Sequence, residues 1–162
     1  MHRHLPRSRR TIGALALAAS AALVAVVPVA APAGATTTGI TVNHGKIRVL
    51  ANVLVVVPVK VVCAGLGGTW FSDSVQVSLL EANGSSVSNG TGMTDSGGVY
   101  QNVGPLLVCD GTTVNTVRVN VLPAAGSGPF SPGKAVITIS VNHGESTGYE
   151  SATYGPRVVT LN

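Results

Sequence analysis

The stretch VLVVVPVKVVC, residues 53–63, alternates apolar side chains with a period of two. Its odd-numbered positions share one face of an extended chain: Val53, Val55, Val57, Val59, Val61 and Cys63. Lys60 falls on the opposite face, so the pattern predicts a strand with one face in the core and one in water. Pro58 cannot donate a backbone hydrogen bond, which indicates an edge, a bulge or a change of sheet at that point.

Three further segments repeat this alternation, at residues 74–81, 116–122 and 135–141. The side chains expected to face inward are Val75, Val77, Leu79, Val117, Val119, Val121, Ala135, Ile137, Ile139 and Val141. Asn-Gly pairs at 83–84 and 89–90 predict hairpin turns. No segment beyond the first 35 residues has a sustained helical period. We therefore expect an all-β fold, an antiparallel β-sandwich of seven or eight short strands.

The first 35 residues have the three parts of a secretory signal peptide. A basic start with four arginines and no acid is followed by an uncharged run rich in Ala, Leu and Val, and then by small residues with Ala33 and Ala35 in A-x-A positions. This order predicts cleavage after Ala35, which leaves one mature domain over residues 36–162. The prolines that interrupt the apolar run argue against a membrane anchor. The twin arginine at 9–10 leaves both the general secretory and the twin-arginine routes open.

Removal of that leader would change the charge of the protein. The full chain carries ten Lys and Arg against six Asp and Glu. Four of the arginines lie in the leader, so the mature chain has six cations and six acids. The count gives no reason to expect a nucleic-acid partner, or a membrane partner once the signal is cleaved.

Cys63 and Cys109 are the only two cysteines of the chain. Cysteines of an exported domain usually pair, so we expect a structural disulfide between them, worth about 4 kcal/mol for a loop of this length. A structural metal site needs about four ligands. His44 and His143 would complete such a set, but both occur in the motif VNHG, which is typical of an exposed turn that closes a strand. We expect no metal and no other cofactor.

The order of these features resembles that of immunoglobulin-like domains. A core Trp follows the first cysteine there; here Trp70 lies seven residues after Cys63. Phe71 is expected to face away from Trp70 if the segment is extended. The succession of Cys, alternating strand, Asn-Gly hairpin, Cys-x-Gly, valine-rich strand and FSPGKA also resembles a group of small secreted proteins of unknown function from high-GC Gram-positive bacteria. This resemblance implies a sandwich fold and implies no enzymatic activity. Whether the disulfide joins two sheets or lies within one stays open.

A catalytic reading of the sequence has one motif to consider. GESTG, residues 144–148, matches G-x-S-x-G around Ser146. That motif needs a strand before it, a helix after it, and an acid and a His later in the chain. No His follows here, so Ser146 is interpreted as a loop serine and no catalytic residue is assigned.

The segment GYESATYGP, residues 148–156, places Tyr149 and Tyr154 in one polar stretch. Surface tyrosines with small polar neighbours suit adaptable recognition, so we expect both to be exposed, in a binding loop outside the regular strands or at a sheet edge. The sequence thus favours a secreted, non-catalytic module that binds an unknown extracellular protein or polysaccharide. A small secreted inhibitor or toxin-like effector is the alternative, and a hydrolase with an unrecognised site is the third possibility.

Overall fold

The computed structural model describes residues 39–51, 53–83, 86–97 and 104–162. These residues form an antiparallel β structure and contain no helix, so the all-β prediction is confirmed. The eight strands are β1 (Ile40–His44), β2 (Arg48–Leu50), β3 (Leu54–Cys63), β4 (Trp70–Asn83), β5 (Ser86–Gly97), β6 (Asn115–Pro123), β7 (Gly133–Glu145) and β8 (Gly148–Leu161). The predicted leader and its cleavage site lie outside the described residues. Nothing in the described part is a helix long and apolar enough to cross a membrane.

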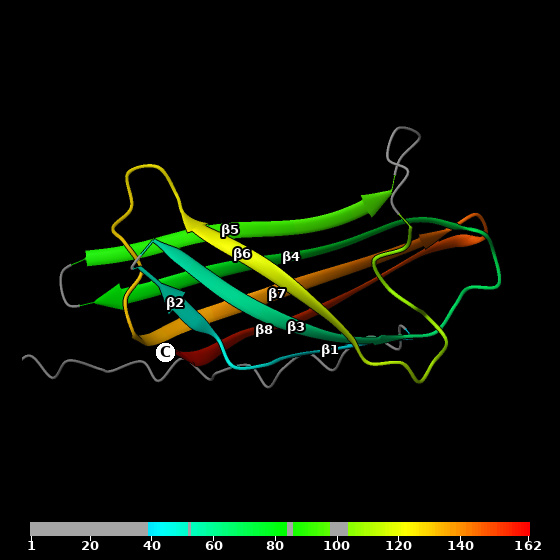
Figure 1. The fold of residues 1–162 in the computed structure, drawn as a ribbon, viewed down its shortest axis with the longest axis horizontal. Coiled ribbons are helices and arrows are strands. Elements are labelled where there is room, and N and C mark those ends of the chain that lie inside the picture. Colours follow the sequence, from blue (N-terminus) through cyan, green and yellow to red (C-terminus); the bar gives the residue numbers. More distant parts are fainter. Residues whose placement is uncertain (1–38, 52, 84–85, 98–103) are drawn as a thin grey trace, which may run out of the picture. The chain divides into compact units, whose positions relative to one another are not determined.

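The strands follow the order β1-β3-β6-β5-β4-β7-β8, and β2 pairs with β3 beyond the end of β1. Figure 1 shows β1, β2, β3 and β6 crossing in front of β4, β5, β7 and β8. We call these two groups the front layer and the back layer. Only two residue pairs join β5 to β6, Gly90↔Pro123 and Thr91↔Leu122. At the opposite border, the backbone N–H of Val49 donates to the carbonyl of Asn162 at 2.7 Å.

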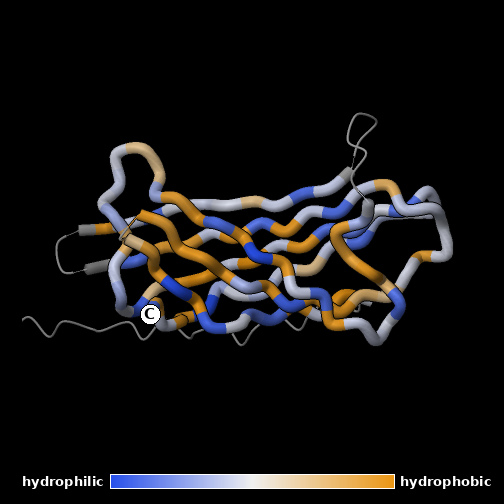
Figure 2. Tube along the Cα trace, in the orientation of Figure 1, coloured by the Kyte–Doolittle hydropathy of each residue, from blue (hydrophilic) through white to orange (hydrophobic). Residues whose placement is uncertain are grey.

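The core lies between the two layers and is made by the alternation that the sequence shows (Figure 2). All of the side chains predicted to face inward on the four alternating segments are buried, with one exception. Val53 is exposed because it lies in the turn before β3, whose first residue is Leu54. Branched side chains at every second position therefore supply most of the apolar area that stabilises the fold.

Pro58 occupies a position where its missing N–H costs no ladder hydrogen bond. In a strand the N–H and C=O of one residue point to the same side. The Pro58 carbonyl accepts from the N–H of Gly45 at 2.7 Å, so that side faces the break between β1 and β2. None of the three features expected at Pro58 is seen in β3, whose register with β6 is continuous from Val55 to Val61. The irregularity lies in the neighbouring strands, where β1 ends and β2 begins.

One of the two predicted Asn-Gly turns is wrong. The pair at 83–84 does fall where β4 ends and β5 soon begins. The pair at 89–90 lies inside β5, opposite Leu79 and Leu80 of β4. Gly90 is required there because a Cβ would collide with the backbone carbonyl of Leu122 in β6. Gly90 thus indicates a close crossing of β5 and β6 and not a turn.

The predicted disulfide is present and accounts for both cysteines. Cys63 and Cys109 are bonded, with their Cα atoms 4.5 Å apart. Cys63 is fully buried at the end of β3, whereas Cys109 lies in the connection that leads from β5 to β6. The N–H of Gly111 also donates to the Cys63 carbonyl at 2.8 Å. The bond therefore fastens the β5–β6 connection to the end of β3 in the front layer and is not a bond between strands of the two layers.

Candidate functional site

A cluster of one histidine and two acids lies at the end of the back layer, beside the β7–β8 turn. Nδ1 of His143 is 2.7 Å from Oδ1 of Asp73, and its Nε2 is 3.0 Å from Oε1 of Glu145. Ionised carboxylates only accept hydrogen bonds, so contact with one through each ring nitrogen favours the imidazolium form, which can donate from both. The three side chains are 3%, 0% and 9% exposed, respectively.

The two carboxylates determine the titration of His143. Burial alone lowers the pKa of this imidazole, but the hydrogen bonds and charges of Asp73 and Glu145 raise it above the ordinary value. The hydrogen bond from His143 in turn lowers the pKa of Glu145, and a bond from the N–H of Gly68 adds to this. In the strand register, Glu150 of β8 lies opposite His143. The Oε2 atom of Glu150 is buried without a hydrogen-bond partner among the described residues.

The cluster also holds two connections against the sheet. Oδ2 of Asp73 accepts from the indole N–H of Trp70 at 2.9 Å and from the backbone N–H groups of Leu106 and Leu107 at 2.9 and 3.1 Å. Oε2 of Glu145 accepts from the Gly68 N–H at 2.6 Å. Because these atoms already serve backbone donors, the cluster acts as a polar anchor for the segments that carry Gly68 and Cys109.

The expectation that both histidines lie in exposed turns is wrong for His143. It lies inside β7 and is buried, opposite Asp73 in β4. His44 does end β1, where it is half-buried and directly precedes Gly45. The described residues include no group of three His, Cys, Asp or Glu side chains placed to hold a metal ion. A sequence signal for His143 existed: Glu145 follows two residues later, which places both on one face of a strand.

Ser146 lies in the two-residue turn between β7 and β8. Its Oγ accepts a hydrogen bond from the N–H of Thr69 at 3.0 Å. A strand follows this serine, whereas the G-x-S-x-G motif of hydrolases requires a helix there. The residue therefore helps to join the turn to the connection before β4.

The two tyrosines proposed for binding lie in a strand at the edge of the sheet, which is one of the two expected positions, but they do not face the same way. Both belong to β8, which is the last strand of the sheet order. Tyr154 is half-buried and packs against the core. Its ring meets His44 edge-on at 5.6 Å between centroids and lies 5.1 Å from the guanidinium carbon of Arg157. Tyr154 thus links β8 to β1, and the expectation that it is an exposed anchor is wrong.

Tyr149 lies on the outer surface of the back layer and is 61% exposed. It pairs with Gly144 of β7, and two of its ring carbons lie 2.8 Å from the point where a Cβ on Gly144 would stand. The missing side chain of Gly144 thus makes the space that the ring occupies. An aromatic ring that covers a cross-strand glycine is held in place while its other side stays open to solvent. Phe71, beside Ser72 at a bulge in β4, is 59% exposed, as expected. Trp70 is half-buried and does not belong to the core cluster of the described residues, so the expectation of a core Trp is not met.

The surface that extends from Tyr149 across the back layer is polar, and most of its side chains are uncharged. Successive cross-strand rows of β8, β7 and β4 contain Ser151, Asn142 and Ser74, and then Thr153, Ser140 and Gln76. The side-chain amide of Asn142 donates to Ser74 Oγ at 3.0 Å. Two charged groups lie on this face of the layer: Asp95 of β5 pairs with Ser74 and continues the first row, and Lys134 lies near the far end of β7. The face therefore offers hydroxyl and amide groups without a net charge.

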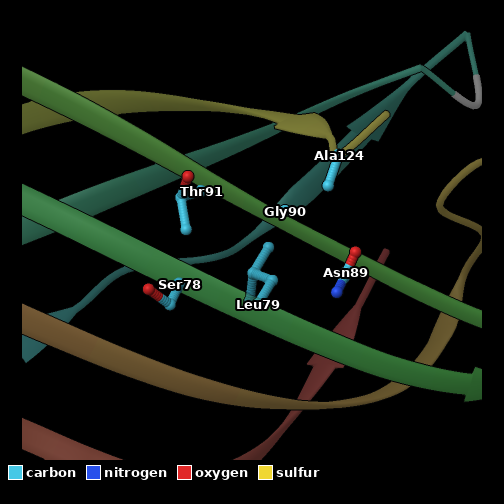
Figure 3. A pocket seen from close by; sticks show the side chains of 6 residues that line it. All are labelled: Ser78, Leu79, Asn89, Gly90, Thr91 and Ala124. Carbon is cyan, nitrogen blue, oxygen red and sulfur yellow. The ribbon is translucent and has the colours of Figure 1, made fainter. Parts of the chain in front are cut away.

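A shallow depression of about 230 Å³ continues this surface between β4 and β5 (Figure 3). It is lined by Ser78, Leu79, Asn89, Gly90, Thr91 and Ala124. Its polar side chains are again two hydroxyls and one amide. The depression thus offers the same kinds of hydrogen-bonding group as the rows near Tyr149.

Comparison with known proteins does not indicate a family for this chain. No protein-family model, no curated protein and no solved structure matches the chain significantly.

Proposed function

We propose that the chain is an exported, immunoglobulin-like sandwich that serves as a non-catalytic extracellular binding module. The strand order supports the fold: β1-β3-β6 and β8-β7-β4 have the positions of strands A-B-E and G-F-C of immunoglobulin domains, with β5 beside β4 in the place of C′. The disulfide is compatible with an oxidising compartment. The signal-peptide pattern of residues 1–35 supports export.

The ligand of this module is an uncharged polysaccharide bound on the outer face of the back layer. Tyr149 carries the proposal, because its ring is fixed on one side by Gly144 and open on the other. A sugar ring presents apolar C–H groups on its faces and hydroxyls at its edge. The exposed tyrosine face suits the former, and the neighbouring Ser, Thr, Asn and Gln side chains suit the latter. The rows beside this ring carry one charge, that of Asp95, which would repel an anionic ligand.

Binding to insoluble neutral glucans and to chitin tests this proposal. Y149A should weaken retention about tenfold, equal to about 1.4 kcal/mol, because an anchoring ring is lost. Y149F keeps the ring and should retain most of the affinity. V158A, which truncates another exposed side chain of β8 on the same face, serves as the matched control and should bind normally. Equal retention of Y149A and V158A would refute the role of Tyr149. Retention only on immobilised secreted proteases would favour the inhibitor alternative.

A further inference from the structure

Residues 36–162 contain equal numbers of cations and acids, but the two kinds of charge lie on different parts of the domain. Four of the six cations belong to the front layer or to the link between its first two strands: Lys46, Arg48, Lys60 and Arg118. All four are exposed, and in the described residues none of them takes part in a salt bridge. Figure 2 shows hydrophilic segments on β2 and β6 of this layer. The front layer therefore has a cationic face although the numbers of cations and acids are equal.

Strand register places three of these cations on the outer surface around Pro58. Arg118 of β6 pairs with Pro58 itself, Arg48 of β2 pairs with Val56, and Lys60 lies two residues beyond Pro58 on β3. Positions two apart on a strand share a face, so all three side chains leave the sheet on the same side. From the level of Val56 to Lys60 the strip is about 13 Å long, at about 3.3 Å per residue.

The acids lie elsewhere. Two are buried between the layers, one belongs to the outer face of the back layer, and two lie near His143: Asp73, Glu81, Asp95, Glu145 and Glu150. Asp95 follows Thr94, whose hydroxyl donates to the Arg118 carbonyl at 3.2 Å, but Asp95 forms no salt bridge with the strip among the described residues. Asp110 lies beyond the end of β3, since it is bridged to Ala64. Its carboxylate accepts hydrogen bonds from Thr112 and Thr113 and lies about 13 Å beyond Lys60 along the strand. The strip around Pro58 is therefore not neutralised by its own domain.

We propose that this face of the front layer binds a linear acidic polysaccharide, with Arg48, Lys60 and Arg118 as its main contacts. Exposed cations without partners attract a polyanion because its bound counterions are released on contact. Arginine also matches a carboxylate with two parallel hydrogen bonds. Because the strip follows β3, it suits an extended chain with repeated negative groups. This inference goes beyond the proposed neutral-glycan site, which lies on the other layer.

A membrane surface is the other polyanion that these cations could meet. Exposed apolar side chains lie at both ends of the front layer: Leu50 at 47% and Leu122 at 55% at one end, and Val114 at 59% at the other. Val114 is two residues from Thr116, which pairs with Lys60. The run of the cations along β3 favours an extended chain over a flat surface, and tighter binding to anionic lipid vesicles would favour a membrane instead.

Binding to polygalacturonate, with neutral dextran as the uncharged comparison, tests the inference on the secreted protein. R48Q/R118Q should weaken binding tenfold or more at low salt. It should also lower the slope of log affinity against log salt concentration by about 2, one for each lost contact. K134Q/R157Q removes the same charge from elsewhere and should change the affinity less than twofold. K60Q, in the middle of the strip, provides a second variant should the double substitution impair folding.

Three results would overturn the inference. They are an equal loss in both double variants, equal binding to dextran, and tighter binding to duplex DNA or to anionic lipid vesicles than to polygalacturonate. Y149A should leave polygalacturonate binding unchanged. A failure of the neutral-glycan proposal and a failure of this one are therefore separately visible.

Discussion

Asp73 and His143 lie directly opposite each other on β4 and β7, and their side chains meet at 2.7 Å inside the core. The pair joins the two central strands of the back layer, while the second oxygen of Asp73 holds the backbone of Leu106 and Leu107. A single carboxylate thus connects the sheet to the segment that carries the disulfide. Loss of the histidine would leave a buried carboxylate with one partner fewer, which is a costly change.

We expect the stability of the domain to depend on pH through this cluster. The pKa of His143 is raised, so its contribution is complete below the ordinary histidine pKa and disappears as the pH rises through the raised value. The pKa of Glu145 is lowered, so its contribution is complete above the ordinary glutamate value and disappears as the pH falls through the lowered one. Urea unfolding across the pH range should therefore show maximal stability between these two limits.

His143→Gln provides the direct test of this dependence. The variant should lower the free energy of unfolding near neutral pH by about 3 kcal/mol, since it breaks a buried ion pair. It should also abolish the loss of stability at alkaline pH. His44→Gln is the matched control, because Nδ1 of His44 contacts the carbonyl of Gly45 and no carboxylate. If the free energy of unfolding of His143→Gln falls at alkaline pH as it does in the wild type, another group causes that loss.

The second prediction concerns the disulfide. Replacement of Cys63 and Cys109 by alanine should lower the free energy of unfolding by about 2–5 kcal/mol. Hydrogen exchange should increase most in the β5–β6 connection, which the bond fastens to β3. Mass spectrometry without reductant should find the purified native protein two hydrogens lighter than the dithiol form. Two titratable thiols in native protein would contradict the bond.

The sequence predicts features that depend on neighbouring residues and misses those that depend on strand order. Alternation along 53–63 suffices to place Val55 and Val57 in the core, because a strand has only two faces. The partner of His143 is seventy residues away, and nothing local shows that Asp73 lies opposite it. The cationic strip is hidden for the same reason. A charge count is blind to the burial of acids such as Glu81.

The candidate site shows the same division. Exposure of Tyr149 and burial of Tyr154 could not be separated in the sequence, because both lie among small polar residues. The structure separates them through the register of β8, which places Tyr149 opposite Gly144 and Tyr154 opposite Ile139. Ile139 faces the core, so its partner does too.

The third prediction concerns the crossing of β5 and β6. Gly92→Ala should destabilise the domain by about 1–3 kcal/mol or more, because a Cβ there would collide with the Asn120 carbonyl of β6. Gly104→Ala is the control, since a Cβ at Gly104 meets no atom within 4 Å and the residue is exposed. Thermal unfolding compares the two. Equal melting temperatures would show that the strands separate at no cost.

The fourth prediction concerns processing. If residues 1–35 are a signal peptide, the protein in a culture supernatant should begin at Thr36, within a few residues. N-terminal sequencing of secreted material measures this directly. An intact Met1 on protein recovered from the membrane fraction would contradict cleavage. Replacement of both Arg9 and Arg10 by lysine distinguishes the export routes, because only the twin-arginine route depends on that pair.

The fifth prediction tests the role of the Tyr149 ring position without altering the tyrosine. Gly144→Ala introduces a methyl group where two carbons of the Tyr149 ring now lie 2.8 Å away, so the ring must leave its position over β7. The hydroxyl oxygen of Ser72 lies 3.0 Å from the same point, so the methyl group alters both side chains beside Gly144. Affinity for a neutral polysaccharide should therefore fall about as far as in Y149A, although every side chain of the proposed surface is still present.

Two controls make the Gly144→Ala result decisive. The double variant G144A/Y149A should bind no more weakly than Y149A alone, because both changes remove one interaction and their effects should not add. Gly104→Ala should bind normally. Additive losses in the double variant would mean that Gly144 acts through the hairpin backbone instead of through the ring. Normal binding by Gly144→Ala would show that the orientation of Tyr149 over the sheet has no part in recognition.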